Sequence, residues 1–435
     1  MALNPLAVAA NEAIQADCPV VFDLLSDVGK ALFFPKGILS QSAEAKTKAT
    51  RYNATIGIAT EGATAMNIEC VHKYFADLSP NECYPYAPST GVPELRSAWK
   101  DKQQGETPSL GDQLTSLPVV TNALTHGLAV VGDLFIGAGD EVLCPDKLWG
   151  NYRLTWEVKR GATISTFPFF TDALDGFNIA GFEAALSERV GKKLVVVLNF
   201  PNNPSGYQPT RDEAAAIVAA LTRAAEAGTR LVVVCDDAYY GMFYADECAT
   251  ESLFGALAQA HENLLAVKVD GATKEMFVWG LRVGFVTYGV KNGTAAAYAA
   301  LEQKTGGAIR GEVSNITRPG QSIVLKAITA ADFRAQQAEK VAILRARGEE
   351  VRRVAYLDEY ADCWDVYPFN AGYFMCLRVK NVDAEELRLH LLDEHGVGTI
   401  SLGKTDLRVA FSCVEEGDIA DLFARIATSI RTLSS

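Results

Sequence analysis

Short apolar runs alternate with longer amphipathic segments between about residues 115 and 290. Several of these runs are continuously apolar, as expected for strands that are buried on both faces of a parallel sheet. The alternation is typical of a sheet covered by helices. The pattern predicts strands at residues 117–121, 140–145, 163–167, 193–200, 230–236, 264–270 and 283–290. The predicted fold class is α/β, with a mostly parallel sheet flanked by helices.

The clearest predicted helix covers residues 210–228. It opens with Thr-Arg-Asp-Glu, a capping box, continues through alanine-rich helix formers and stops at a glycine. After about residue 292 the pattern changes to long helical stretches at residues 293–310 and 321 to about 360. Alternating strands and helices follow up to the end of the chain.

This change of pattern predicts two domains. Residues 62–312 form the large domain. The first 60 residues contain no strong series of strands and are expected to pack with the C-terminal part. Residues 1–61 and 313–435 therefore make a smaller, discontinuous α+β domain.

Composition excludes several classes of protein. The chain has 435 residues, 49% hydrophobic and 21% charged, which is the balance of a globular protein and not of a disordered chain. The formal charge of −13 argues against broad contact with nucleic acid but permits a local basic pocket for one small anion. The apolar runs, such as residues 194–198, are too short to span a bilayer, and the start lacks the pattern of a signal peptide.

The nine cysteines are scattered, odd in number and without a Cys-x-x-Cys pair, which is typical of reduced thiols. We therefore expect a cytoplasmic protein without a membrane or nucleic-acid partner. His390 and His395 do not form a His-Glu-x-x-His motif, so no metal site is predicted.

Three polar residues follow consecutive predicted strands. Asn203 lies in Asn-Phe-Pro-Asn-Asn-Pro-Ser-Gly, Asp236 ends an apolar strand, and Lys274 follows the next strand. Each has a structural alternative: an ordinary turn for Asn203, a helix N-cap for Asp236 and solvated surface for Lys274. Because ligands bind at the carboxyl ends of strands in open α/β sheets, we expect all three to line one crevice.

Arg282 lies eight residues after Lys274, at the start of the next apolar run. A second cation in a partly buried crevice lowers the pKa of a lysine and favours the free amine, which is the nucleophile towards carbonyls. With Asn203 and Asp236 the set supplies an amine, a carboxylate, an amide and a guanidinium. Pyridoxal phosphate requires these groups for its Schiff base, ring nitrogen, ring hydroxyl and phosphate.

In its order and spacing this set resembles the class I aminotransferases, the fold-type I pyridoxal-phosphate enzymes typified by aspartate aminotransferase. The resemblance extends from about Tyr86 to Arg408. The lysine motif of the family reads here Gly271-Ala-Thr-Lys274, followed by Gly-Leu-Arg282-Val-Gly. Phe277 stands where the family usually has a small residue.

The resemblance implies a role for each of these residues. Lys274 would form the internal aldimine and move the proton between substrate and cofactor, and Asp236 would pair with the ring nitrogen. Tyr239 and Asn203 would both bond the ring hydroxyl. Arg282 would bind the phosphate.

Other segments resemble the cofactor site of the family less closely. Trp149, in Leu-Trp-Gly-Asn-Tyr, is the expected stacking residue, with a core tryptophan as the alternative. The phosphate cup reads Thr-Asn-Ala-Leu-Thr-His-Gly-Leu and departs from the usual Gly- or Ser-rich turn, so the expected donors are the amides of Ala123, Leu124 and Thr125. Tyr86 is similar to the tyrosine that reaches the phosphate of a neighbouring subunit, which implies a homodimer with shared active sites.

Two arginines are expected to bind the substrate. Arg408, in Leu-Arg-Val-Ala-Phe-Ser, would hold the α-carboxylate as a bidentate fork, with an exposed strand edge as the alternative. Arg310, four residues before Ser-Asn, resembles the arginine that crosses the subunit interface to bind a side-chain carboxylate. Its alternative is a cation at a helix C-terminus. Trp149 and Asn203 are expected to contact the substrate as well.

The sequence therefore predicts an aminotransferase that works by a ping-pong reaction. Dicarboxylic or aromatic L-amino acids are the expected donors, and a 2-oxo acid such as 2-oxoglutarate is the expected acceptor. One alternative keeps the cofactor and performs a β- or γ-elimination, as in a C–S lyase or a cyclopropane-forming synthase. The other is a non-catalytic ligand sensor, which ordinarily carries a DNA-binding module for which neither end of this chain has basic helical sequence.

Overall fold

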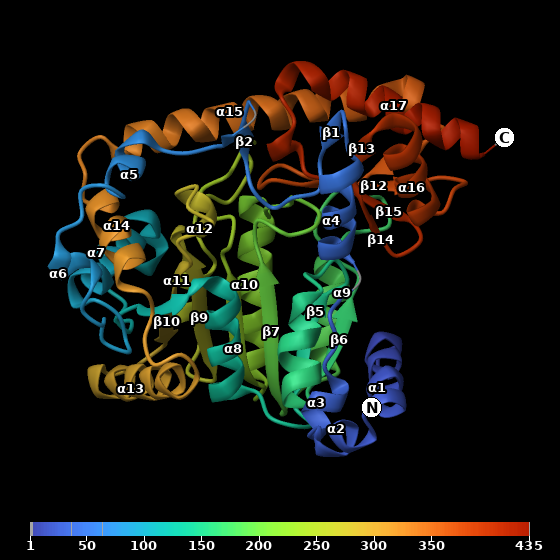
Figure 1. Cartoon of the computed structure of the whole chain (residues 1–435). Coiled ribbons are helices and arrows are strands. Elements are labelled where there is room, and N and C mark those ends of the chain that lie inside the picture. The colour runs from blue at the N-terminus through green and yellow to red at the C-terminus, as the bar shows by residue number, and fades with distance from the viewer. Residues whose placement is uncertain (1–2, 36, 63, 435) are drawn as a thin grey trace.

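A seven-stranded sheet forms the centre of the computed structural model, which describes residues 3–35, 37–62 and 64–434 (Figure 1). The strand order is β4-β10-β9-β8-β7-β5-β6. All neighbouring pairs are parallel except those of β10, which runs antiparallel to β4 and β9. The strands are β4 (Val119–Asn122), β5 (Glu141–Pro145), β6 (Thr163–Phe167), β7 (Lys193–Asn199), β8 (Arg230–Asp236), β9 (Leu264–Gly271) and β10 (Val283–Val290). All seven predicted strands are present.

Helices cover both faces of this sheet. On one face, α8 (Ala123–Phe135) approaches so closely that a Cβ added to Gly127 would lie 3.2 Å from Val286 Cγ2. On the other face, a Cβ on Gly289 would lie 2.6 Å from a side chain of α11 (Phe254–Ala260). Residues 286 and 289 point to opposite sides because side chains alternate along a strand. The sheet is thus buried on both faces, as its apolar strands require.

The predicted capping box forms at the start of α10 (Arg211–Glu226). Thr210 Oγ1 accepts a hydrogen bond from the Glu213 amide at 3.3 Å, and the Thr210 amide donates to Glu213 Oε2 at 2.8 Å. Gly228 then adopts a φ of +93°, in the left-handed region that glycine tolerates best.

The prediction of one continuous helix at residues 321–360 is wrong. The structure has two helices, α14 (Arg318–Ile328) and α15 (Phe333–Ala355). Thr329 Oγ1 donates back to the Leu325 carbonyl at 2.8 Å, at the end of α14. Both helices contact α5 (Glu69–Lys73), but α14 also packs on α6 (Pro80–Cys83) and α7 (Pro93–Glu106), whereas α15 packs mainly on α17 (Ile419–Leu433).

A second, smaller sheet lies in the C-terminal part, with strand order β11-β12-β15-β14 and antiparallel neighbours. The helix α4 and the short strand β1 join this part, because β1 pairs with β13 and α4 packs against β13 and β14. These elements are α4 (Ile38–Lys48), β1 (Tyr52–Asn53), β11 (Trp364–Val366), β12 (Met375–Val379), α16 (Ala384–His395), β13 (Val397–Gly398), β14 (Ile400–Leu402) and β15 (Asp406–Val409).

The remaining elements are short or lie at the margins of the two sheets. They are β2 (Thr60–Glu61), β3 (Thr64–Ala65), α9 (Ile179–Ser187), α12 (Ala272–Glu275), α13 (Ala295–Glu312) and a π-helical turn at Arg153–Val158. None of the described helices has the length and apolar character needed to cross a membrane. All nine cysteines are free thiols.

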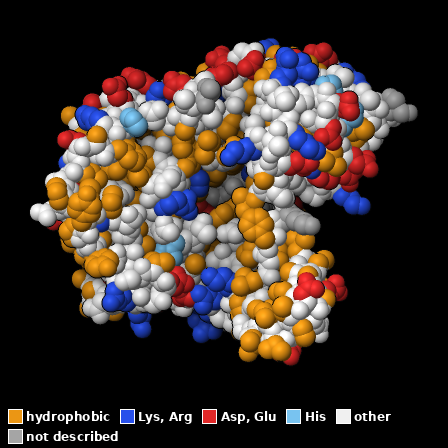
Figure 2. Space-filling view, viewed as in Figure 1, with side chains coloured by type: hydrophobic (Ala, Val, Ile, Leu, Met, Phe, Trp, Pro, Cys, Tyr) orange, Lys and Arg blue, Asp and Glu red, His pale blue; other side chains and the backbone are white. Residues whose placement is uncertain are grey.

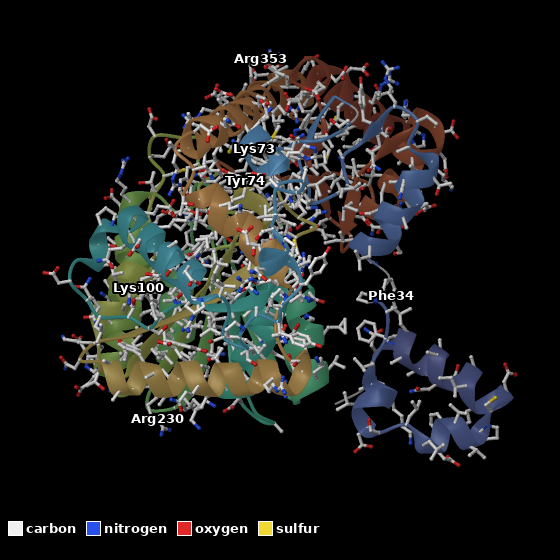
Figure 3. All side chains as sticks on the ribbon, turned by 60° about the vertical axis from the view of Figure 1, so that its left-hand side comes forward. Phe34, Lys73, Tyr74, Lys100, Arg230 and Arg353 are labelled. Carbon is white, nitrogen blue, oxygen red and sulfur yellow. The ribbon has the colours of Figure 1, made fainter. Side chains whose placement is uncertain are left out.

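The first three helices form a projecting arm. Helices α1 (Pro5–Asp17), α2 (Pro19–Leu24) and α3 (Asp27–Ala31) pack against one another. Figure 3 shows the arm apart from the body, with Phe34 between the arm and the body. The expectation that the first 60 residues pack with the C-terminal part therefore describes α4 and β1 but not this arm.

Candidate active site

The carboxyl ends of β7, β8 and β9 meet at one edge of the sheet and carry the three residues that the sequence singled out. Asn199 and Asp236 are register partners in the parallel pair β7–β8. The Asn199 side chain donates to the Asp236 carbonyl at 2.9 Å and accepts from the Asn203 amide at 2.8 Å. Asn199 therefore ties the loop that carries Asn203 to the strand that carries Asp236.

Asp236 is 2% exposed, and its two carboxylate oxygens differ in their surroundings. Oδ2 accepts a hydrogen bond of 2.5 Å from the Tyr152 hydroxyl, whereas buried Oδ1 has no partner within the described chain. Burial raises the pKa of Asp236 to about 6, although the Tyr152 hydrogen bond and the charge of Lys274 oppose this rise. A turn and not a helix follows Asp237, so the N-cap alternative does not apply.

Lys274 lies in α12, directly after β9, and its carbonyl accepts from the Tyr373 hydroxyl at 3.1 Å. Its ammonium group lies 4.9 Å from the centre of the Tyr239 ring. Burial lowers the pKa of Lys274 to about 8; the charge of Asp236 raises it and that of Arg282 lowers it. The solvated-surface alternative is thus wrong, and the environment favours the free amine more than water does.

Tyr239 is buried beside this lysine. Its ring contacts the edges of Tyr373 and Phe374 at centroid distances of 5.3 and 5.6 Å. Burial raises the pKa of its hydroxyl, so the group remains a protonated phenol that can donate a hydrogen bond. A Cβ on Gly57 would lie 3.8 Å from this hydroxyl, which brings the loop after β1 to the site.

Arg408 lies on β15 between β12 and β14, so the alternative of an exposed edge is wrong. Its Nη1 donates to Asn203 Oδ1 at 3.1 Å, and its Nη2 donates to the Thr55 carbonyl at 2.8 Å. The guanidinium lies 4.2 Å from the centre of the Phe374 ring. Its buried Nε has no hydrogen-bond partner among the residues that the structure places. Because a buried donor without a partner costs about 1–3 kcal/mol, this Nε suits an acceptor supplied by a ligand.

The first turn of α8 lies against the loop that carries Arg282. Ala123 and Arg282 have φ values of +59° and +55°, and the Ala123 amide donates to the Arg282 carbonyl at 3.0 Å. This bond corrects the prediction for Ala123, whose amide is already engaged. The amides of Leu124 and Thr125 remain in the first turn, where backbone N–H groups lack intrahelical acceptors and suit an anion.

Two glycines allow this close approach. A Cβ on Gly271 would lie 2.7 Å from the backbone of Gly284, and a Cβ on Gly284 would lie 2.7 Å from the backbone of Ala123. Phe277, the departure from the family motif, has a φ of +56°, which is uncommon for a bulky residue. The lysine loop is therefore held in a conformation that its sequence alone does not favour.

Trp149 is partly exposed and not a core residue. Its ring meets the edge of Tyr152 at a centroid distance of 5.6 Å and an interplanar angle of 87°. Tyr152 in turn stacks on Trp156, at 5.2 Å and 6°. The indole is thus anchored through Tyr152 and remains partly exposed.

Tyr86 and Arg310 lie apart from this cluster. Tyr86 is 90% exposed. Arg310 is an exposed residue of the last turn of α13 and donates to Ser314 Oγ at 2.5 Å, which fits the helix C-terminus alternative within one chain. In the described residues no hydrogen bond or ion pair joins either side chain to Lys274, Asp236 or Arg408.

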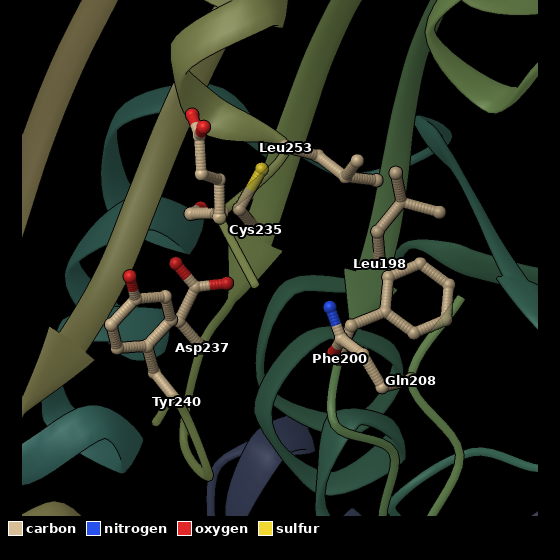
Figure 4. A pocket seen from close by; sticks show the side chains of 9 residues that line it. Leu198, Phe200, Gln208, Cys235, Asp237, Tyr240 and Leu253 are labelled. Atoms are coloured by element: carbon tan, nitrogen blue, oxygen red, sulfur yellow. The ribbon is translucent and has the colours of Figure 1, made fainter. Parts of the chain in front are cut away.

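A second group of buried charges lies behind the site. Asp237 points to the side of the sheet opposite Asp236, where it lines a small pocket with Cys235 and Tyr240 (Figure 4). It pairs with Lys268, and both side chains are almost fully buried. Lys268 Nζ also lies 3.8 Å from Asp270. This group is a structural support next to Asp236.

The sequence missed Tyr152, Thr55 and Phe374. Tyr152 lies in the quoted segment with Trp149, but nothing in the sequence shows that its hydroxyl reaches Asp236. Thr55 contributes its backbone carbonyl, which any residue at this position would also provide, so the sequence does not single it out. Two buried atoms, Asp236 Oδ1 and Arg408 Nε, have no hydrogen-bond partner among the described residues, and the amine of Lys274 has a lowered pKa. These three groups suit a ring nitrogen, a carboxylate and a carbonyl carbon, respectively.

Comparison with known proteins defines the class. Residues 55–426 match the family model of aminotransferase class I and II. An aminotransferase from Anaerococcus prevotii has a similar structure, with a TM-score of 0.81, 22% identity and coverage of 91% of this chain and 96% of that one. The cytoplasmic aspartate aminotransferase of Saccharomyces cerevisiae gives a TM-score of 0.76 at 18% identity, covering 95% and 99%. The fold is therefore that of the fold-type I aminotransferases.

Among curated proteins, the cytoplasmic aspartate aminotransferase of Caenorhabditis elegans is 21% identical over 373 residues, which cover 83% of this chain and 88% of that protein. The mitochondrial aspartate aminotransferase of Schizosaccharomyces pombe is 22% identical over 271 residues, which cover 62% of this chain and 59% of that protein. The chain belongs to the class I and II aminotransferase family.

Proposed function

We propose that the protein is a pyridoxal-phosphate-dependent aminotransferase that moves an amino group between an L-amino acid and a 2-oxo acid. One observation carries this proposal. A buried carboxylate with one unpartnered oxygen, Asp236, lies at the same sheet edge as a lysine whose pKa is lowered to about 8, Lys274. A pyridoxal ring needs this combination at its nitrogen and its aldehyde.

Lys274 Nζ is the reacting amine. Its lowered pKa leaves a useful fraction unprotonated near neutral pH, and this free amine would hold the cofactor through its carbonyl carbon. The same nitrogen would take the proton from the substrate α-carbon and deliver it to the cofactor within one half-reaction, and would move a proton in the opposite direction in the other half-reaction. The bound cofactor supplies the ring that accepts the electron pair left on that carbon.

The other residues bind and orient. Asp236 Oδ1 holds a proton on the ring nitrogen, and Tyr239 and Asn203 donate to the ring hydroxyl. Arg282, with the amides of Leu124 and Thr125, binds the phosphate, while Gly271 allows that loop to approach. Trp149 stacks on the ring.

Arg408 fixes the substrate. Its Nε and the edge of the guanidinium bind the α-carboxylate, whereas Thr55 and Asn203 hold the other nitrogens in place. A planar fork of this kind binds a carboxylate in one orientation, which directs the α-carbon proton towards Lys274.

We propose dicarboxylic or aromatic L-amino acids as substrates, with 2-oxoglutarate as acceptor. Relatives named aspartate aminotransferase and aspartate/prephenate aminotransferase support this range. Arg310 would bind a side-chain carboxylate in the active site of a neighbouring subunit, because its guanidinium is exposed within one chain.

We further propose a homodimer with shared active sites. Tyr86 is 90% exposed in one chain. In the proposed dimer its side chain reaches the phosphate site of the second copy. The arm offers more apolar surface to a second copy, and hydrophobic side chains cover much of it in Figure 2. They include Val8, Val20, Val21, Leu24 and Val28, all exposed. Sedimentation equilibrium of the chain with and without residues 1–35 tests this: the full chain should be a dimer, and a monomer at micromolar concentration would contradict it.

The proposed domains are a large domain of residues 62–312 and a small domain of residues 1–61 and 313–435, from which the arm of α1–α3 projects. The cytoplasm is the proposed location, supported by the C. elegans relative that is named cytoplasmic.

A visible spectrum tests the proposed reaction. Purified protein supplied with pyridoxal phosphate should show the yellow absorbance of a lysine Schiff base, which L-aspartate or L-tyrosine should convert to the pyridoxamine form. Lys274→Ala should lose the yellow band. Release of pyruvate and ammonia without a 2-oxo acid acceptor would indicate elimination instead, and the absence of any band would overturn the cofactor assignment.

A further inference from the structure

Among the described side chains, Tyr152 donates a hydrogen bond to the Asp236 carboxylate. We propose that Tyr152 is a positioning residue that orients this carboxylate towards the cofactor ring. This inference rests on the proposed function, because it assigns Tyr152 to the group that holds the ring nitrogen. Tyr152 acts through Asp236 and touches neither reacting atom.

The geometry separates the two oxygens of the carboxylate. The Tyr152 hydroxyl donates to Oδ2 at 2.5 Å, and Oδ1 is left buried without a partner in the described chain. A carboxylate can rotate about its Cβ–Cγ bond, and a short bond at one oxygen restricts that rotation. The free oxygen is therefore held in one direction before a ring arrives, which lowers the cost of ordering it on binding.

Tyr152 is itself firmly held. It is 1% exposed and stacks on Trp156, whose Nε1 donates to the Leu128 carbonyl of α8 at 3.1 Å. A Cβ on Gly132 would lie 2.9 Å from the Trp156 ring, so a glycine is needed where the indole meets α8. The turn that follows Tyr152 is π-helical, a form often found at functional sites.

This packing connects Tyr152 to two other parts of the cofactor site. Its ring lies perpendicular to that of Trp149, the proposed stacking residue, in a T-shaped contact. Through Trp156 it is fixed to α8, whose first turn is proposed to bind the phosphate. One aromatic residue thus ties together the groups for the ring face, the ring nitrogen and the phosphate.

The charges around the pair favour donation by a neutral phenol. Burial and the negative charge of Asp236 raise the pKa of Tyr152 well above its usual value, so it remains protonated. Its hydrogen bond lowers the pKa of Asp236, against the larger effect of burial. Loss of the hydroxyl should therefore raise that pKa and leave less carboxylate at neutral pH. The other groups that face the pair are Lys274 from α12, Asp237 from β8, Cys144 from β5 and Tyr239 from the turn after β8.

Tyr152→Phe tests the proposal, because it removes the hydroxyl and keeps the ring that packs on Trp156. The dissociation constant of pyridoxal phosphate should rise about tenfold at pH 8, as expected for one lost hydrogen bond to a charged group. The acid limb of the affinity profile should move to higher pH. With ¹⁵N-labelled cofactor, the ring-nitrogen resonance should move towards that of the unprotonated ring.

Two controls separate this effect from a general loss of structure. Tyr288→Phe removes another buried hydroxyl, which lies 2.7 Å from Thr305 Oγ1, and should change neither the affinity nor the ¹⁵N resonance. In an Asp236→Asn background, Tyr152→Phe should weaken cofactor binding by less than twofold, because Tyr152 then has no carboxylate to orient. Such non-additivity is the signature of two residues that act as one unit.

The outcomes distinguish the two proposals. If the wild-type protein binds no pyridoxal phosphate, the proposed function fails. If wild type binds it and Tyr152→Phe leaves the pH profile and the ¹⁵N resonance unchanged, the role of Tyr152 is refuted. An equal loss of affinity with and without the Asp236 carboxylate would also refute it, since the hydroxyl would then act elsewhere.

Discussion

The lowered pKa of Lys274 gives a quantitative test that needs neither substrate nor cofactor. With a pKa of about 8 instead of the 10.5 that is usual for lysine, the amine should titrate in mildly alkaline solution. At pH 8 roughly half of it is unprotonated, against roughly three molecules in a thousand for a solvated lysine. The free-amine fraction is thus raised by about two orders of magnitude.

Two neighbours should shift this pKa in opposite directions. The negative charge of Asp236 raises the pKa of Lys274, so Asp236→Asn should lower it below 8. The positive charge of Arg282 lowers it, so Arg282→Met should raise it. Burial remains the largest cause in every variant, and neither change should restore the value of a solvated lysine.

Competitive labelling of the cofactor-free protein with acetic anhydride measures these values. The extent of acetylation at each pH is read by mass spectrometry on the peptide that contains Lys274. Lys48 is the internal reference, because it is exposed and its pKa is raised by its acidic partners Glu44 and Asp393. A Lys274 midpoint near that of Lys48 would refute the reasoning, as would equal shifts of the same sign in the two variants.

Three further substitutions test other parts of the site. Arg408→Lys removes the planar fork and should raise the half-saturating concentration of every amino acid substrate about 10- to 100-fold in steady-state kinetics. A change below twofold would show that Arg408 does not bind the substrate carboxylate. Arg310→Met should weaken use of L-aspartate about tenfold and leave L-alanine unchanged, so an equal effect on both would contradict its role. Lys268→Met leaves the buried carboxylates of Asp237 and Asp270 without their cation. It should lower the free energy of unfolding by about 3–5 kcal/mol in urea titrations. A loss below about 1 kcal/mol would show that water solvates these two carboxylates.

Much of the sheet could be predicted because its strands carry a local signal. Residues 193–199 and 230–236 are almost continuously apolar, which marks strands buried on both faces. The capping box at Thr210 is also local, since its two hydrogen bonds join residues three apart. The break between α14 and α15 was missed because it is only four residues long and contains neither glycine nor proline.

The site was predictable where residues follow consecutive strands. Asn203, Asp236 and Lys274 could be grouped because the carboxyl ends of parallel strands meet at one edge. Contacts between distant parts of the chain have no such signal. Arg408 meets Asn203 across 205 positions, and the Tyr152 hydroxyl meets Asp236 across 84. The hydrogen bond from the Ala123 amide to the Arg282 carbonyl likewise results from tertiary packing and has no local signal in the sequence.

The charges of Asp236 and Lys274 connect cofactor binding to activation of the amine. Burial moves both groups towards their neutral forms, raising the pKa of Asp236 to about 6 and lowering that of Lys274 to about 8. Their mutual attraction opposes both shifts, so without a ligand the carboxylate favours the ammonium form of Lys274. A protonated ring nitrogen at Oδ1 offsets the negative charge of Asp236 and weakens that attraction. The pKa of Lys274 should therefore fall further when the ring is seated, so the amine becomes a better nucleophile when the carbonyl is in reach.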